Sequence, residues 1–226
     1  MDKQTLDLIE QPLYDFGEAA YTLRVPKSTL RAWFLGQPGF NKVFELKSKE
    51  PRLLSFANLL EAHTLSAIRK IHGVYLNKVR QALRNIEKRF DSDIPGHPLL
   101  DSRLRTNNVH LFLDELATLT VISDNNQTAM RQLLEKFLQR IEIQQNKVRF
   151  FPYVVKPGVE DTKAVALDPR IQFGKAILAK RGVATFIIAE RFRAGESVIE
   201  LARDYRIGED EIQDALRYET YKLEAA

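Results

Sequence analysis

The chain has 226 residues, enough for more than one hydrophobic core, and it contains no cysteine. Disulfides and thiolate metal sites are therefore excluded, and we expect a reducing cytoplasm as its location. No stretch approaches the roughly 18 apolar residues that a membrane span requires, and the N-terminal segment lacks the apolar run of a secretory leader.

The net charge of +4 is unevenly distributed along the chain. Residues 13–90 carry 14 Lys or Arg against 6 Asp or Glu, whereas residues 186–226 carry 6 against 10. A basic first part favours a polyanionic partner such as nucleic acid, and an acidic last part favours a different partner. Random drift of surface charge along the chain is the alternative explanation.

Residues 14–36 contain two short amphipathic helical patterns with a tight joint between them. Apolar residues recur at helical spacing in both, namely Phe16, Ala19, Ala20 and Leu23, then Leu30, Trp33 and Phe34. Pro26 suits the start of the second helix, because its missing N–H costs nothing there. This layout is typical of a helix-turn-helix, whose second helix enters the major groove. An αα-corner without DNA-binding function is the alternative.

Polar residues around the second helix supply the candidate DNA contacts. At the start of that helix, four residues would read bases or fix the register: Lys27, Ser28, Thr29 and Arg31. Five basic residues outside it would add phosphate contacts: Arg24, Lys42, Lys47, Lys49 and Arg52. Residues 40–46 predict a strand, which would form a wing beside the second helix; a solvated basic loop is the alternative.

The same segment resembles the helix-turn-helix of MerR-type regulators. The matching residues are Glu18-Ala19-Ala20, Thr29-Leu30-Arg31 and Trp33. Arg24 stands where the family prefers Gly, and Pro26 stands where it prefers a capping Ser. The resemblance implies a homodimer that binds two half-sites of double-stranded DNA, without specifying the DNA sequence.

Two longer helices are predicted next. Ser55 would cap the first, which would run to Gly73, and the second would span residues 74–90 with a basic outer face. His63 and His72 have no carboxylates near them in sequence, so we expect packing or surface roles rather than metal binding.

The middle of the chain predicts a small α+β module between two linkers. Residues 91–98 and 156–163 have linker composition. Between them we expect strands over 109–113, 116–121 and 148–155, and a helix over 128–144. Packing, dimerisation or spacing is the expected role of this module.

The C-terminal part predicts two short extended pieces, 165–167 and 176–178, followed by three helices. Thr185, Ser197 and Glu209 would begin these helices. The third helix carries an acidic leading edge made of Glu209, Asp210, Glu211 and Asp214. Phosphates would repel this edge, so we expect protein docking or dimerisation here rather than DNA binding.

This C-terminal part resembles the small module found in antitoxins of VapB-like type II toxin–antitoxin pairs. The matching residues are Asp168-Pro169-Arg170-Ile171, Phe173-Gly174, Gly182-Val183-Ala184-Thr185, Ala194-Gly195-Glu196-Ser197 and Ala215-Leu216-Arg217-Tyr218. Lys180-Arg181-Gly182 departs from the usual Gly-Thr-Arg. The resemblance implies a PIN-like ribonuclease toxin with a carboxylate-lined site. Guanidinium groups could block such a site, and the candidates are Arg170, Arg181, Arg191 and Arg193.

The predicted fold is mainly α with a small α+β middle part. It comprises a winged, MerR-like DNA-binding domain over residues 1–91, the middle module over 92–163 and a three-helix module over 164–226. Catalytic and metal-binding motifs are not apparent, so we expect no enzymatic activity and no cofactor. The predicted function is a DNA-binding antitoxin that represses its own operon and neutralises a toxin. A ligand-sensing MerR-like regulator, with its pocket in residues 92–226, and an architectural adaptor on DNA are the alternatives.

Overall fold

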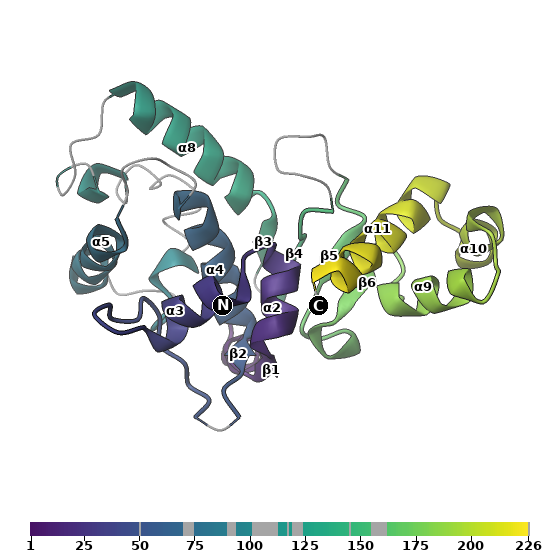
Figure 1. The fold of residues 1–226 in the computed structure, drawn as a ribbon, viewed down its shortest axis with the longest axis horizontal. Coiled ribbons are helices and arrows are strands. Elements are labelled where there is room, and N and C mark those ends of the chain that lie inside the picture. Colours follow the sequence, from purple (N-terminus) through teal and green to yellow (C-terminus); the bar gives the residue numbers. More distant parts are fainter. Residues whose placement is uncertain are drawn as a thin grey trace. The chain divides into compact units, whose positions relative to one another are not determined.

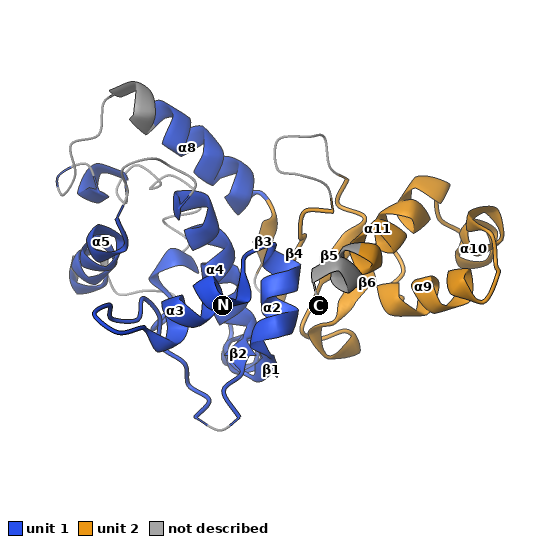
Figure 2. Ribbon diagram, viewed as in Figure 1, with its two compact units in different colours: residues 1–139 blue, residues 140–226 orange. Residues whose placement is uncertain are grey.

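The computed structural model describes residues 1–49, 51–69, 75–89, 94–100, 113–116, 118, 124–144, 146–154 and 162–225. The chain divides into two units, residues 1–139 and 140–226 (Figure 2). Helices dominate both units and the sheets are small, as predicted from the sequence (Figure 1). Among the described helices, none has the length and apolar character needed to cross a membrane. The division into three domains stays a prediction.

The first unit is built from helices with one minimal sheet. Its elements are α1 (Lys3–Ile9), β1 (Pro12–Tyr14), α2 (Phe16–Leu23), α3 (Lys27–Leu35), β2 (Leu54–Ser55), α4 (Phe56–Arg69), α5 (Leu76–Arg89), the 3-10 turn η1 (Pro98–Leu100) and α8 (Asp124–Leu138). Strands β1 and β2 pair antiparallel. They bring the start of α2 close to the start of α4.

Helix α4 forms the centre of the first unit. Every residue from Phe56 to Ile68 is buried, and the helix packs against α2, η1 and α8. Its start is closed by a reciprocal cap, because Ser55 Oγ accepts from Asn58 N at 3.1 Å and Asn58 Oδ1 accepts from Ser55 N at 3.2 Å. The predicted Ser55 cap is thus confirmed.

The packing role expected for His63 is also confirmed. Its Nε2 lies 3.0 Å from the carbonyl oxygen of Phe137 in α8, and the two rings stack 4.8 Å apart. His72 lies outside the described residues.

The second unit places three helices beside a four-stranded antiparallel sheet of order β3-β4-β5-β6. Its elements are β3 (Ile141–Gln144), β4 (Lys147–Phe150), β5 (Val165–Leu167), the 3-10 turn η2 (Gln172–Gly174), β6 (Ala176–Leu178), α9 (Thr185–Arg193), α10 (Val198–Tyr205) and α11 (Glu209–Ala225). Leu178 of β6 joins Ile188, Leu201 and Ile212 in one core cluster, one from each helix. The predicted extended pieces and helix starts are confirmed here, with Thr185 as the first helical residue rather than the cap.

The structure differs from the prediction in three stretches. Residues 40–46 form a loop rather than a strand, because the N–H groups of Val43 and Phe44 both donate to the carbonyl oxygen of Trp33 in α3. The helix predicted over 128–144 ends at Leu138, and its last residues are β3, paired with β4.

Residues 113–116 are helical, whereas the prediction ends one strand at 113 and begins the next at 116. Leu113 and Leu116, three positions apart, are both buried there, which is a helical spacing. The rest of the two strands predicted over 109–121 lies outside the described residues.

Candidate functional site

Helices α2 and α3, which we call the N-terminal helix pair, meet through a tight turn. Asp15 caps α2, its Oδ1 accepting from Gly17 N at 2.6 Å and Glu18 N at 2.9 Å. The helix ends at Arg24, whose backbone is left-handed with φ 53° and ψ 44°. Val25 N then donates to the carbonyl oxygen of Ala20 at 3.0 Å, which closes the turn before α3. The turn therefore has the helix–turn–helix arrangement that the spacing predicts.

The inner face of this pair is apolar and its outer face is polar. Leu30, Trp33 and Phe34 of α3 are buried, as expected from their spacing. Lys27, Ser28 and Arg31 are exposed, and Thr29 is half-buried. The Arg31 guanidinium lies 5.5 Å from the centroid of the Phe16 ring, which holds it at the junction of the two helices.

The other candidate phosphate contacts differ in how they are held. Lys42 pairs with Glu45 at 2.5 Å, and Lys47 pairs with Glu10 at 2.6 Å. Lys49 and Arg52 are exposed on the same segment. The Lys42–Glu45 pair is exposed on both sides and therefore weak, so a phosphate could compete for Lys42. The Glu10 side chain, in contrast, is only 17% exposed.

Helices α10 and α11, which we call the C-terminal helix pair, repeat the backbone turn of the N-terminal pair. Ser197 caps α10 through a capping box with Glu200. The helix ends at Arg206, which is left-handed with φ 53° and ψ 54°. Ile207 N then donates to the carbonyl oxygen of Ala202 at 3.0 Å. The cap, the eight-residue helix and the left-handed arginine occur in the same order in both pairs.

The two pairs carry opposite charge at the start of the second helix. Where α3 presents Lys27, α11 presents exposed Glu209 and Asp210. Glu211 is held within the unit, since its Oε2 accepts from Gly208 N at 3.1 Å and lies 3.0 Å from Lys180 Nζ. Carboxylates at a helix start suit the helix dipole, but they oppose phosphate binding.

Arg170 is engaged by a buried carboxylate. Asp168 is fully buried and accepts from Arg170 Nε at 2.9 Å, from Arg170 Nη2 at 2.6 Å and from Arg149 Nε at 3.1 Å. Burial alone would raise the pKa of Asp168, but the hydrogen bonds from the two arginines outweigh it and lower that pKa. This cluster fixes the segment between β5 and β6.

The other predicted partner-binding arginines have different surroundings. Arg191 bonds to Glu196 and to Asp204, and its guanidinium lies 5.0 Å from the centroid of the Tyr205 ring. The hydrogen bonds to Glu196 are the main reason that the pKa of Arg191 is raised. Arg181 Nη2 donates to the carbonyl oxygen of Arg206 at 3.0 Å.

Arg193 is exposed near the end of α9. Its guanidinium forms no hydrogen bond or ion pair with any residue that the structure describes.

A buried polar cluster in the first unit was not predicted. His97 Nδ1 lies 2.8 Å from Glu61 Oε2, and its Nε2 lies 3.0 Å from Glu10 Oε1. Burial by itself lowers the pKa of His97, but the carboxylates of Glu61 and Glu10 outweigh it and raise that pKa to about 9. The Gly and Pro residues around His97 suggested a linker, whereas Ile94, His97 and Pro98 are buried.

Comparison with known proteins shows a family match over part of the chain and likenesses along most of it. Residues 165–218 match a family model described as a protein of unknown function, DUF433. The chain is 26% identical over 239 residues to the Mycobacterium tuberculosis protein named Putative antitoxin VapB45, covering 94% of this chain and 96% of that protein. The X-ray crystal structure of Rv2018 from Mycobacterium tuberculosis matches with a TM-score of 0.69 at 24% identity, covering 91% of this chain and 98% of that one. At 24% identity, this likeness shows a similar fold and nothing further.

Proposed function

We propose that this chain is the antitoxin of a type II toxin–antitoxin pair. It binds operator DNA as a homodimer, represses its own operon and neutralises a PIN-like ribonuclease toxin by direct binding. The observation that carries the proposal is the match to the VapB45 protein, which extends over nearly the whole of both chains. The proposal assigns no enzymatic step to the chain itself.

DNA binding is assigned to the N-terminal helix pair. In a helix-turn-helix, the first residues of the second helix contact base edges in the major groove, and Lys27, Ser28 and Arg31 are exposed there. Contact between Arg31 and the Phe16 ring limits the rotamers of that arginine before DNA arrives. Lys47, Lys49 and Arg52 would add sequence-independent contacts.

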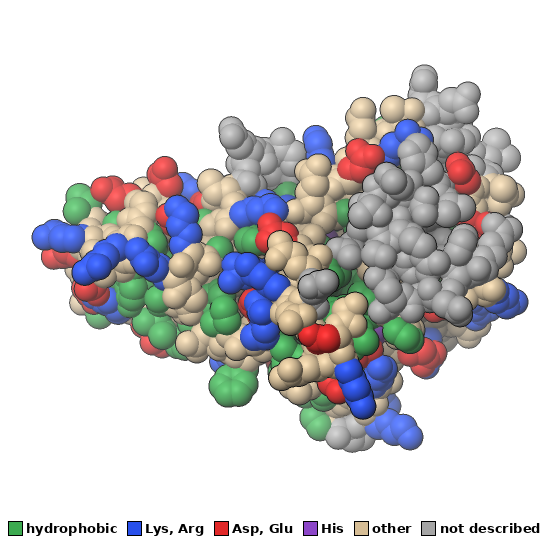
Figure 3. Space-filling model, turned by 180° about the vertical axis from the view of Figure 1, so that it is seen from behind, with side chains coloured by type: hydrophobic (Ala, Val, Ile, Leu, Met, Phe, Trp, Pro, Cys, Tyr) green, Lys and Arg blue, Asp and Glu red, His purple; other side chains and the backbone are tan. Residues whose placement is uncertain are grey.

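Toxin binding is assigned to the second unit. The face of this unit seen in Figure 3 interleaves basic, acidic and hydrophobic side chains. Phe192 and Ile199 are exposed, and Arg193 directly follows Phe192. Aromatic residues and arginine dominate the energetics of protein interfaces. Arg193 is the strongest of the four candidate arginines, because Arg170, Arg181 and Arg191 already bond within the unit.

The test is a gentle affinity purification of the tagged chain from its native locus, followed by native mass spectrometry. We expect a stoichiometric small protein, encoded next door, that is toxic when expressed alone. Arg193→Ala should reduce its recovery, whereas Lys3→Ala, an exposed lysine of α1 in the first unit, should not. A homodimer that elutes alone but retains specific DNA affinity would contradict the antitoxin assignment.

That outcome would favour a ligand-responsive, MerR-like regulator as the second candidate. One observation supports this candidate, namely a pocket directly after α3. The pocket lies within residues 35–98, whereas the sequence suggested a sensing site in residues 92–226.

A further inference from the structure

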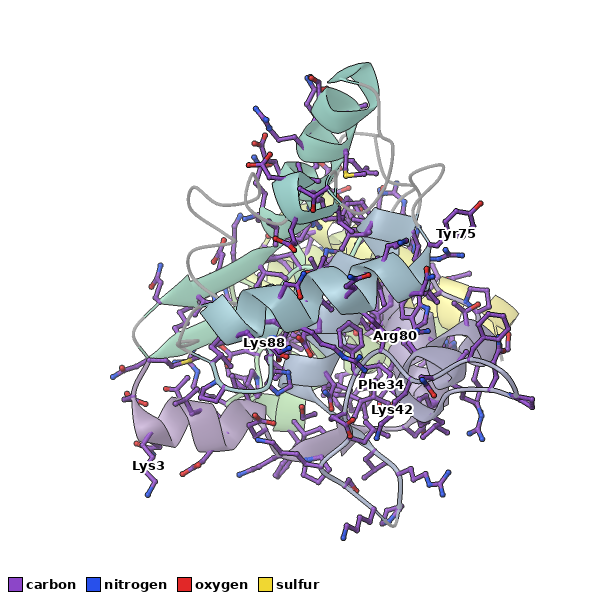
Figure 4. All side chains as sticks on the ribbon, turned by 90° about the vertical axis from the view of Figure 1, so that its left-hand side faces the viewer. Lys3, Phe34, Lys42, Tyr75, Arg80 and Lys88 are labelled. Atoms are coloured by element: carbon purple, nitrogen blue, oxygen red, sulfur yellow. The ribbon has the colours of Figure 1, made fainter. Side chains whose placement is uncertain are left out.

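A pocket of about 700 Å³ lies in the first unit, between helix α5 and the segment that follows α3. Its apolar walls include Phe40, Phe44 and Leu83, and its cations are Lys42, Arg80 and Arg84. Figure 4 shows Arg80 extending from α5 beside Phe34 and Lys42, with Lys88 farther along the same helix. Pockets of this size hold ligands as large as a nucleotide.

Arg80 has an unsatisfied donor in this pocket. Its Nε is buried and donates no hydrogen bond to any residue that the structure describes. Burial, and then the neighbouring charge of Arg84, lower the pKa of Arg80. A buried donor without an acceptor is unfavourable, and a bound group could supply the acceptor that Arg80 Nε lacks.

Two like charges meet at the same place. Arg80 and Arg84 are one helical turn apart on α5 and both line the pocket, so they repel each other. Two carboxylates also line the pocket: Glu45, which pairs with Lys42, and Glu87, three positions after Arg84 on α5. Within the described part of the chain, neither Arg80 nor Arg84 forms an ion pair.

We propose that this pocket binds a phosphate-bearing ligand. Paired guanidinium groups suit a phosphate, which carries up to two negative charges and accepts several hydrogen bonds. The phosphate would satisfy Arg80 Nε and relieve the repulsion from Arg84. The ring of Phe40, 64% exposed, provides a surface for an aromatic or apolar part of the ligand.

The phosphate could belong to a free nucleotide-like molecule or to a DNA backbone. The chemistry that Arg80 and Arg84 recognise is the same for both sources. The site is concave and Arg80 Nε is buried, so a small molecule can reach this atom more easily than a DNA backbone can.

The pocket is continuous with α3. Gly36, at the end of α3, lines the pocket with φ of +75°, and an added Cβ would come within 3.0 Å of the carbonyl oxygen of Phe40. The loop is thus packed closely against the helix end. If the proposed DNA-binding role of α3 is correct, ligand binding would change DNA affinity; the binding itself does not depend on that role.

The experiment titrates the full-length protein by calorimetry with ATP, with pyrophosphate and, separately, with a short DNA duplex. The variants are Arg84→Ala, Arg80→Met and the matched control Lys88→Ala, an exposed lysine of α5 that does not line the pocket. Circular dichroism establishes that each variant is folded. Arg84→Ala keeps the test valid if Arg80→Met does not fold.

We expect ATP or pyrophosphate to bind, with affinity about tenfold weaker in Arg84→Ala and unchanged in Lys88→Ala. If neither small molecule binds but Arg84→Ala alone weakens duplex binding, the phosphate comes from the DNA backbone. Equal losses in Arg84→Ala and Lys88→Ala would overturn the proposal, because they indicate general attraction to a basic helix. Absence of binding by all three probes would also overturn it.

Discussion

Arg24 and Arg206 adopt the same left-handed backbone conformation at the same position of two helix pairs, with φ 53° in each. In both pairs the next residue donates its N–H to an alanine carbonyl five residues earlier. The chain therefore builds one turn twice and gives the two copies opposite charge. The shared turn conformation leads to an expectation for stability, and the different surface charges lead to expectations for binding.

Replacing Arg206 with Gly should stabilise the second unit. A non-glycine residue in the left-handed region costs about 1–2 kcal/mol, part of which is offset by the greater freedom of Gly in the unfolded chain. We expect Arg206→Gly to raise the free energy of unfolding by about 0.5–1 kcal/mol. Native-state hydrogen exchange of the α10 and α11 amides measures it. Arg206→Ala is the control, since it removes the side chain and keeps the left-handed backbone strain. An equal rise in the free energy of unfolding for Arg206→Ala would refute the backbone explanation.

If the proposed DNA-binding role of α3 is correct, Arg31→Ala should weaken specific DNA binding by about 1–3 kcal/mol, because it would remove a bidentate contact to a base. The measurement compares affinities for the operator and for a random duplex of the same length. Lys3→Ala, an exposed lysine of α1, serves as the control. Equal losses on both duplexes would make Arg31 a phosphate contact rather than a base contact.

Lys47→Ala should lower the salt dependence of DNA binding. If Lys47 leaves Glu10 for a phosphate, removing it reduces the slope of log K against log salt by about one. Affinity measured across a salt series gives the slope. An unchanged slope would mean that Lys47 stays with Glu10 and lies outside the DNA footprint.

His97 should make stability fall at alkaline pH. Its pKa is raised from 6.5 to about 9 in the folded chain, so its contribution is fully present below pH 6.5 and is lost as pH rises through 9. The size of this contribution is about 3 kcal/mol. This contribution is measured by urea unfolding of the wild type and of His97→Gln between about pH 6 and 10, a range that includes both pKa values of His97. The difference between the two proteins should shrink with pH, and parallel curves would exclude the proton on His97 as its source.

Local periodicity predicted the helices well where one face is buried. The faces of α2 and α3 followed from the spacing of Phe16, Ala20, Leu30 and Trp33, and the cap at Ser197 followed from its residue type. These features depend on residues within one or two helical turns. The sequence therefore sufficed for the N-terminal helix pair and for most of the second unit.

Contacts between distant residues account for what the sequence did not predict. The alternation in residues 40–46 indicated a strand, but the N–H groups of Val43 and Phe44 bond to Trp33 instead. Ile141 and Ile143 fit both a helix and a strand, and pairing with β4 decides the matter. Arg80 looked like one more exposed charge on a basic helix, because its position in the pocket depends on the segment after α3.

The burial of α4 on all its faces has a consequence for how this protein can be divided. Residues Phe56–Ile68 supply the surface on which α2 packs, and β1 finds its partner in β2 at Leu54–Ser55. A peptide that ends before Leu54 would keep the N-terminal helix pair and lose both supports. The N-terminal helix pair therefore cannot be transferred alone onto another scaffold; it can be transplanted only together with α4, the helix on which it packs.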